Sequence, residues 1–221
     1  MSLRKTIFVV GEYFHIFNRG NSKQKIFHDL QDYRHFIGLL YLLNTQENRN
    51  LYDLKRNHHF DIYSVVNKNP LVSIGAYCLM PNHFHIILTE KIEGGLSKFM
   101  QKVATAYVMH HNNKYRRTGS LFEGKFKSEH ANNDRYLKYL FSYIHLNPIK
   151  LIDKNWKKNG IKNREETLDY LYKYEFSSYL DFLGVQRNQN KILNIKDFPI
   201  YFPTNKRFTS EIISWFALGK T

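Results

Sequence analysis

Two apolar runs lie almost end to end near the middle of the chain and constrain its fold more than any other feature. Residues 71–80 (LVSIGAYCLM) and 83–89 (HFHIILT) are rich in β-branched and aromatic residues, and only Pro81 and Asn82 separate them. Runs of this length and composition, bounded by turn residues, are typical of buried strands. Because so short a connection joins antiparallel neighbours, the sequence predicts a β-hairpin over residues 71–89.

Helical and strand patterns alternate around this hairpin. Apolar side chains at three- and four-residue spacing indicate helices, and runs of β-branched and aromatic residues indicate strands. The predicted elements are a strand over residues 7–17, a helix over 29–43, the hairpin, a helix over 96–111, a basic loop or strand over 114–127, and a helix from Asn133 or Asp134 to the residue before Pro148. This order predicts an α+β fold in which helices pack on an antiparallel sheet.

The ends of these elements suggest a main domain and an accessory segment. Residues 45–70 are polar and are consistent with an insertion or a long loop. Beyond Pro148 the sequence becomes rich in lysine and asparagine, with helical patterns near residues 165–173, 177–183 and 210–217. We therefore expect a main domain over residues 1–150 and a helical accessory tail over residues 151–221, with aromatic residues such as Trp215, Phe216 and Tyr179 docking the tail.

The charge of the chain points to a polyanionic partner. Its net charge is +14 and its isoelectric point is about 9.7, and a surface this basic binds nucleic acid readily because phosphate neutralisation releases counterions. The single cysteine, Cys78, excludes an internal disulfide and a thiolate zinc site. No apolar run is long enough for a membrane span and the start of the chain does not resemble a signal peptide, so we expect a cytoplasmic protein without a membrane partner.

His83 and His85 form the first chemically suggestive pair. Residues two apart on a strand point to the same face, so both imidazoles project together while Phe84 faces the other way. Two imidazoles placed in this way can bind one divalent cation. The alternative is a pair of half-buried histidines without a ligand, which is the ordinary state of a His-x-His sequence in a chain with 11 histidines.

Tyr143 and Asn147 form the second pair. They are four residues apart at the end of the predicted third helix and therefore share one of its faces. A tyrosine there could attack phosphorus while the asparagine oxygen joins the histidines on a cation. Ordinary packing is the alternative for any of the 16 tyrosines, and spacing alone does not favour Tyr143 over Tyr107, Tyr136 or Tyr139.

Four motifs in a fixed order carry a resemblance to a known family. Together they resemble the single-tyrosine HUH transposases, specifically the REP-associated tyrosine transposase branch, over roughly residues 10–150. The motifs are residues 13–20 (YFHIFNRG), 80–88 (MPNHFHIIL), 119–127 (GSLFEGKFK) and 143–148 (YIHLNP). Residues 120 and 125 are serine and lysine here, where the family more often has histidine and arginine, and the change to lysine loses a bidentate fork.

The resemblance implies a fold, a site and a reaction. It implies a ferredoxin-like catalytic domain over residues 1–150, with a divalent metal, Mg²⁺ or Mn²⁺, held by His83, His85 and Asn147. Tyr143 is then the nucleophile that cuts single-stranded DNA, often beside a hairpin, and remains linked to it as a 5′-phosphotyrosine. A 3′-hydroxyl later rejoins the strand, so no ATP or other small-molecule cofactor is required.

Basic and aromatic residues outside this site are candidates for DNA contacts. Arginines and lysines are expected to bind phosphates and aromatic rings to stack on bases, although a solvated basic loop is the alternative for each residue taken alone. The candidates are Arg19, Arg116, Arg117, Phe122, Lys125 and Lys127, with Phe126 as a further ring.

The sequence therefore predicts an active DNA transposase, a metal-dependent single-strand endonuclease and strand transferase. A domesticated, non-catalytic nucleic-acid-binding protein is the first alternative, and a nuclease that uses water in place of tyrosine is the second. Both a monomer and a homodimer are compatible with the sequence.

Overall fold

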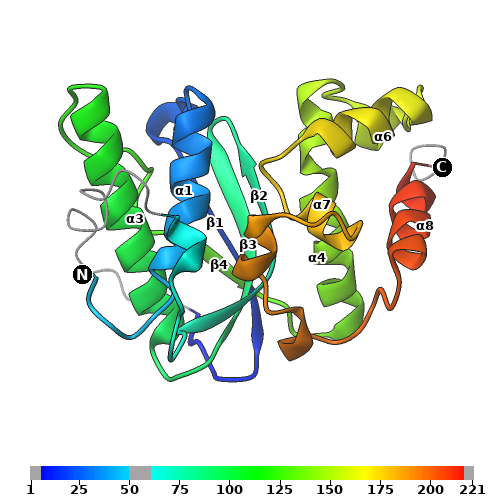
Figure 1. Ribbon diagram of the computed structural model, residues 1–221. Helices are drawn as coiled ribbons and strands as arrows, with labels where there is room; N and C mark the ends of the chain where they lie inside the picture. The colour runs from blue at the N-terminus through cyan, green and yellow to red at the C-terminus, as the bar shows by residue number, and fades with distance from the viewer. Residues whose placement is uncertain (1–5, 50–60, 217–221) are drawn as a thin grey trace.

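The computed structural model describes residues 6–49 and 61–216, and a four-stranded antiparallel sheet lies at its centre (Figure 1). Its strands run in the spatial order β2-β3-β1-β4. They are β1 (Tyr13–Arg19), β2 (Val72–Met80), β3 (His83–Glu90) and β4 (Lys127–His130). Helix α1 (Leu30–Leu42) connects β1 to β2 and α3 (Gly95–Lys114) connects β3 to β4, which is the ferredoxin-like order. The predicted α+β fold is confirmed.

The remaining elements follow the sheet in sequence, except for short 3₁₀ turns. Helix α4 (Asp134–Leu146) comes first, then η3 (Asn147–Leu151), α5 (Trp156–Asn159), α6 (Arg164–Lys173), α7 (Tyr179–Phe182), η4 (Asn188–Ile192), η5 (Ile195–Asp197) and α8 (Asn205–Trp215). The other 3₁₀ turns are η1 (Asn21–Lys23) and η2 (Ile62–Ser64). Of the segment 45–70 discussed above, residues 50–60 lie outside the described residues.

The helix starts agree with the sequence, whereas the start of the first strand does not. Asp29 and Asn133 cap α1 and α4 by accepting a hydrogen bond from a backbone N–H three residues on, as expected for such residues at these positions. The first strand begins at Tyr13 and not at residue 7, and it continues to Arg19, because pairing with β3 runs from Tyr13 to Arg19. Composition shows that a segment suits a strand but does not show where its partner ends.

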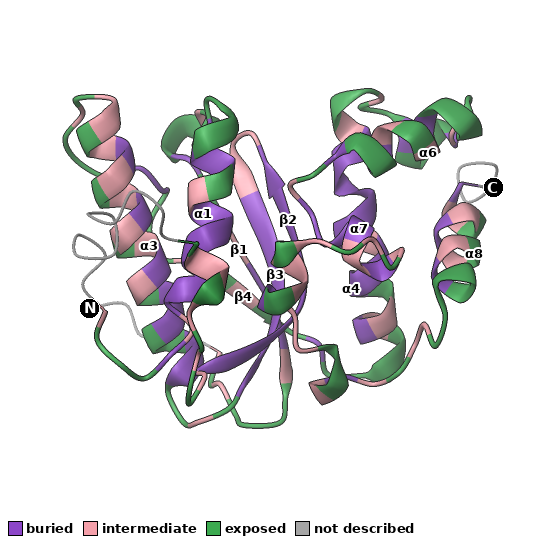
Figure 2. Ribbon diagram, viewed as in Figure 1, coloured by how far each residue is buried: buried purple, intermediate pink, exposed green. Residues whose placement is uncertain are grey.

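The sheet has a hydrophobic core on each face, as the buried residues in Figure 2 show. Helices α1 and α3 cover one face, and α4 covers the other with the segments that follow it. Side chains alternate along β3, so that Phe84 and Ile86 belong to the first core and Ile87 belongs to the second. His83 and His85 therefore face α4.

The segment after Pro148 continues the sheet at its β2 edge. Ser178 N donates to Tyr77 O and Leu79 N donates to Phe176 O, both over 2.9 Å, so backbone groups that an edge strand leaves unpaired are satisfied. β2 has an irregular register around Gly75, where an added Cβ would lie 2.9 Å from the Phe198 ring. The expected docking of the tail is confirmed, since its aromatic side chains, including Tyr179, Phe208 and Phe216, are buried in the second core.

Among the described residues, no helix is long and apolar enough to cross a membrane.

Candidate active site

Three histidines meet on the sheet face that α4 covers. His83 and His85 come from β3, and their ring centres are 5.0 Å apart. His15 comes from the neighbouring β1, and its Nε2 lies 2.9 Å from Nδ1 of His85, with the two rings stacked. The shared face of the His83 and His85 pair follows from strand alternation as predicted. The sequence alone does not place His15 beside this pair, because β1 and β3 are far apart in the chain.

Hydrogen bonds fix one nitrogen of each histidine in the pair. Nδ1 of His83 lies 2.6 Å from Oδ1 of Asn82, an amide oxygen that can only accept, so this nitrogen carries the proton. Nδ1 of His85 contacts His15, whose own Nδ1 lies 3.8 Å from a carboxylate oxygen of Glu129. In both His83 and His85, Nε2 is the nitrogen that remains for a ligand.

Burial keeps these imidazoles neutral. It lowers the pKa of His83 to about 4, with Lys150 and Arg19 adding to the effect, and it lowers the pKa of His85 well below its usual value. It also lowers the pKa of His15 to about 4, against the opposing influence of Glu129. A neutral imidazole is the form that binds a metal ion.

Helix α4 places Tyr143 directly over the histidines. The centre of its ring is 5.6 Å from the centre of the His85 ring and 6.1 Å from that of His15, edge-on to both. Burial raises the pKa of Tyr143, so the phenol keeps its proton at neutral pH. Tyr139 stacks on Tyr143 one helical turn earlier, at 5.8 Å.

The other tyrosines considered from the sequence have different surroundings. Tyr107 lies in the core on the opposite face of the sheet, where its hydroxyl donates to Ile26 O. Tyr136 donates its hydroxyl to Glu129 over 2.9 Å. Of the tyrosines weighed, Tyr143 is the one whose ring contacts both His15 and His85.

Asn147 lies beside this tyrosine with both ends of its amide engaged. Its Nδ2 donates to the backbone oxygen of Tyr143 over 2.9 Å, and its Oδ1 accepts from Lys150 Nζ over 3.2 Å. The side chain is buried, with 1% of the residue exposed. Asn147 therefore adjoins the histidine site, and its oxygen, the atom predicted to bind a metal, faces a lysine.

Two lysines complete the surroundings of Tyr143. Nζ of Lys157 is 4.3 Å from the centre of the tyrosine ring, and Nζ of Lys150 is 5.5 Å away. Burial lowers the pKa of both lysines. Neither lysine stands out in the sequence, because both lie in the lysine-rich segment after Pro148, where nothing local distinguishes one lysine from another.

The donor set fits a divalent metal only if an amide contributes. Among residues 6–49 and 61–216, no cluster of three or more His, Cys, Asp and Glu side chains is arranged to hold a metal ion. His83 and His85 present neutral imidazoles whose Nδ1 atoms are already fixed by hydrogen bonds, which is the usual arrangement around a metal-bound histidine. With Asn147 Oδ1 they would form a mixed nitrogen and oxygen set suited to Mn²⁺ or Mg²⁺.

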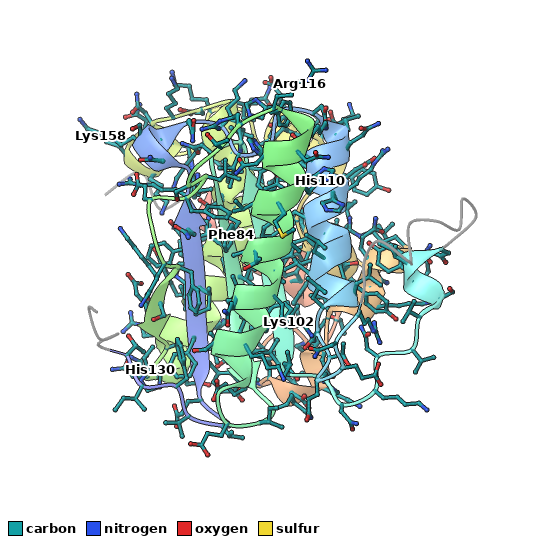
Figure 3. All side chains as sticks on the ribbon, turned by 90° about the vertical axis from the view of Figure 1, so that its left-hand side faces the viewer. Phe84, Lys102, His110, Arg116, His130 and Lys158 are labelled. Carbon is teal, nitrogen blue, oxygen red and sulfur yellow. The ribbon has the colours of Figure 1, made fainter. Side chains whose placement is uncertain are left out.

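Some of the predicted DNA contacts lie at the end of the sheet where β3 begins with His83. Arg19 pairs in register with His83 and forms an ion pair with Glu123. Arg116 follows the C-terminal end of α3, at the opposite end of the molecule from His130 (Figure 3). Arg117 is half-buried beside it, and the side chain of Lys127 is exposed at the start of β4.

Phe122 and Lys125 line a cavity of about 600 Å³ on the face of the sheet opposite Tyr143, together with Phe84 and Phe126. The stacking role expected for Phe122 needs correction, because the residue is only 6% exposed and its ring packs edge-on against Phe84 at 6.0 Å. This ring belongs to the core, and little of it is accessible to a DNA base.

A family model described as transposase, IS200-like, matches residues 39–147. The matched segment contains the β2–β3 hairpin with His83 and His85, and it ends at Asn147 after spanning α4. Over this segment the chain matches the IS200-like transposase family. The transposase superfamily predicted from the four motifs is thereby confirmed.

The chain is also similar to a solved structure of a REP-associated tyrosine transposase bound to a REP hairpin. The two share 16% sequence identity with a TM-score of 0.46, and the similarity covers 86% of this chain and 90% of the other. No curated protein matches the chain.

Proposed function

We propose that this transposase is a metal-dependent single-strand DNA endonuclease and strand transferase with Tyr143 as its nucleophile. The observation that carries the proposal is the position of Tyr143. The centre of its ring lies 5.6 Å from the centre of the His85 ring, on the sheet face to which both His83 and His85 point. A phenol next to a metal-binding pair is the arrangement that phosphoryl transfer to tyrosine requires. The match to a transposase family supports DNA as the substrate.

The proposed reaction exchanges one phosphodiester for another. Oη of Tyr143 attacks the phosphorus, the bond from phosphorus to the 3′ oxygen breaks, and the DNA 5′ phosphate becomes linked to the tyrosine. The phenol loses one proton and the departing 3′ oxygen gains one, so the protons balance. A second 3′-hydroxyl reverses these changes and rejoins the strand. No ATP is consumed, because the phosphotyrosine retains the energy of the broken diester.

His83, His85 and Asn147 would hold the metal, for which Mg²⁺ and Mn²⁺ are the candidates. When bound, the ion polarises a phosphate oxygen and makes phosphorus easier to attack. The roles of the surrounding side chains follow from their contacts. Asn82 and His15 orient the two imidazoles through Nδ1, and Glu129 faces the far nitrogen of His15.

Single-stranded DNA with a hairpin is the proposed substrate. The net charge of +14 supports binding to DNA backbone. The motifs over residues 13–20, 119–127 and 143–148, which resemble the REP-associated branch, favour hairpin-bearing strands among the candidates. The proposed phosphate contacts are Arg19, Arg116, Arg117, Lys125 and Lys127.

The test uses a pool of hairpin-bearing single strands with randomised flanks, incubated with the full chain and Mg²⁺ or Mn²⁺. Because the 5′-phosphotyrosine retains the downstream fragment, a label at the DNA 3′ end should appear in a covalent protein band, and a 5′ label should appear in a shorter free strand. Sequencing the captured DNA identifies the cleaved site for later experiments.

Tyr143→Phe should abolish the covalent band, whereas Tyr139→Phe should keep it. Tyr139 is the matched control because it lies on the same helix and stacks on Tyr143. A band that persists in Tyr143→Phe would refute the assignment of the nucleophile. Cleavage without any covalent band would favour the nuclease that uses water, and binding without cleavage by the unmodified chain would favour the non-catalytic alternative.

A further inference from the structure

We propose that Lys150 and Lys157 form a binding site for the scissile phosphate beside Tyr143 and hold its non-bridging oxygens during the attack. This inference rests on the proposed function, since it assigns the groups that receive the substrate anion at the same site. Both lysines follow residue 147, where the family match ends, so they belong to the part of the chain that the family model does not describe.

The first support is the convergence of the two side chains. Lys150 belongs to η3 and Lys157 to α5, yet their ammonium groups lie 5.5 Å and 4.3 Å from the centre of the same tyrosine ring. Trp156 is buried, which anchors the short helix that carries Lys157. The C-terminal segment therefore brings two cationic groups to the ring that carries the proposed nucleophile.

The second support is the charge balance of the site. Within the described part of the chain, no carboxylate oxygen lies within 4.0 Å of either ammonium group, and Lys150 donates instead to the neutral amide oxygen of Asn147. A half-buried cation, Lys150, and a more exposed one, Lys157, thus lie beside the same ring without an acidic partner, which is unfavourable until an anion binds.

A phosphodiester is the anion that suits this pair. It carries one negative charge spread over two non-bridging oxygens, and the attacking phenol must approach its phosphorus. Two ammonium groups beside it would neutralise the charge that develops during attack, and such groups contribute most where water is partly excluded. A phosphate seated here would also compete with Asn147 for Lys150, leaving the amide oxygen for the metal.

The alternative is that the lysines only pack against the tyrosine ring or add to the general positive field. Lys158 provides a control for the second possibility, because it is the neighbour of Lys157 on α5 and is exposed at the edge of the molecule (Figure 3). Removing its charge changes the net charge of the chain equally, without a contact to Tyr143.

The experiment measures the single-turnover rate of covalent adduct formation on the selected DNA for Lys150→Met, Lys157→Met, the double variant and Lys158→Met. We expect each of the first two to lower the rate by about 10-fold or more, with a smaller change in DNA affinity, and Lys158→Met to match the unmodified chain. Lys150→Arg and Lys157→Arg keep the charge and should restore much of the rate. Thermal denaturation and Mn²⁺ binding show whether each variant is folded.

A second substrate distinguishes phosphate contact from packing. A methylphosphonate at the scissile position replaces one charged oxygen with methyl, so it should slow the unmodified chain more than it slows the double Lys→Met variant. The inference would be overturned if the methylphosphonate slowed the unmodified chain and the double variant equally. It would also be overturned if folded Lys150→Met and Lys157→Met reacted at rates within about twofold of Lys158→Met. Either result would leave Tyr143 as the nucleophile. An unmodified chain that forms no Tyr143-dependent adduct would overturn the proposed function together with this inference.

Discussion

His15 connects the predicted metal pair to a carboxylate. Its Nε2 contacts His85 Nδ1 at 2.9 Å, and its own Nδ1 lies 3.8 Å from Glu129. If Nδ1 of His85 donates this bond, Nε2 of His85 presents a lone pair to the metal, and a partner of this kind also fixes the ring orientation. A single strand histidine outside the His-x-His motif thus governs how one proposed ligand is presented.

We expect His15→Phe to weaken Mn²⁺ binding by about 10-fold to 100-fold, because the variant removes the acceptor that orients His85. His15→Gln should bind more tightly than His15→Phe, since its amide oxygen can accept the same hydrogen bond. The free Mn²⁺ signal in electron paramagnetic resonance titrations measures the affinity without requiring catalysis. His130→Gln is the control, because His130 pairs with Phe14, stacks on its ring and contacts Glu12 through Nε2, so its side chain does not contact His85. Unchanged affinity in His15→Phe would contradict the role.

At the scale of elements, the two sides of helix α4 contact different parts of the molecule. One side presents Tyr143 to the histidines, and the other buries Phe141 and His145 against the C-terminal segment. His145 is fully buried, and its Nε2 lies 2.7 Å from Oγ of Ser178, in the segment that pairs with the edge of β2. The position of the proposed nucleophile therefore depends on packing with residues that follow it in the chain.

The buried His145 makes the stability of this packing sensitive to acid. Burial lowers its pKa to about 3, so the folded protein binds no proton there between pH 6.5 and about 3, whereas the unfolded chain does. The free energy of unfolding should therefore fall as the pH decreases through this window, with this residue contributing up to roughly 1.4 kcal/mol per pH unit.

Urea denaturation in the presence of a chelator, at pH 7, 6 and 5, measures this slope. His145→Gln can still form a hydrogen bond to Ser178 but does not titrate, so its slope should be shallower. His15 and His83, whose pKa values burial lowers to about 4, remain in both proteins and contribute equally. Identical slopes for the two proteins would show that His145 does not carry the effect.

For the whole molecule, the excess of positive charge should dominate the affinity for DNA. A net charge of +14 predicts that the affinity for single-stranded DNA falls steeply with salt, since each neutralised phosphate releases counterions. Arg116 is exposed at the end of α3 and is a proposed phosphate contact, whereas Lys98 is exposed in the first turn of the same helix. The two residues allow a comparison of equal charge at opposite ends of one element.

Fluorescence anisotropy at several salt concentrations measures the affinity for single-stranded DNA and tests whether Arg116 contributes more to it than Lys98. Arg116→Gln should reduce the slope of log affinity against log salt by roughly 0.7, the value for one lost contact to single-stranded DNA. Lys98→Gln should leave the slope close to that of the unmodified chain. Equal changes in both variants would indicate a diffuse positive field without a preferred end.

Local patterns in the sequence were sufficient for the elements and for part of the site. Alternation along residues 83–89 places His83 and His85 on one face and Phe84 on the other, and this holds in the structure because strand geometry has a period of two. The hairpin, the alternation of strands and helices, and the capped starts of α1 and α4 were predictable for the same reason, since each depends on residues close in sequence. The ferredoxin-like strand order was instead an expectation from the family resemblance.

Contacts between distant segments were decided only by the tertiary structure. Spacing could not separate Tyr143 from 15 other tyrosines, whereas packing of α4 on the sheet brings its ring against His15 and His85. The same packing carries Lys157 to that ring from a segment whose composition suggested only a basic tail. Local periodicity determines which way a side chain faces, but which elements meet depends on how two cores and a sheet edge are filled, and no short stretch of sequence encodes that.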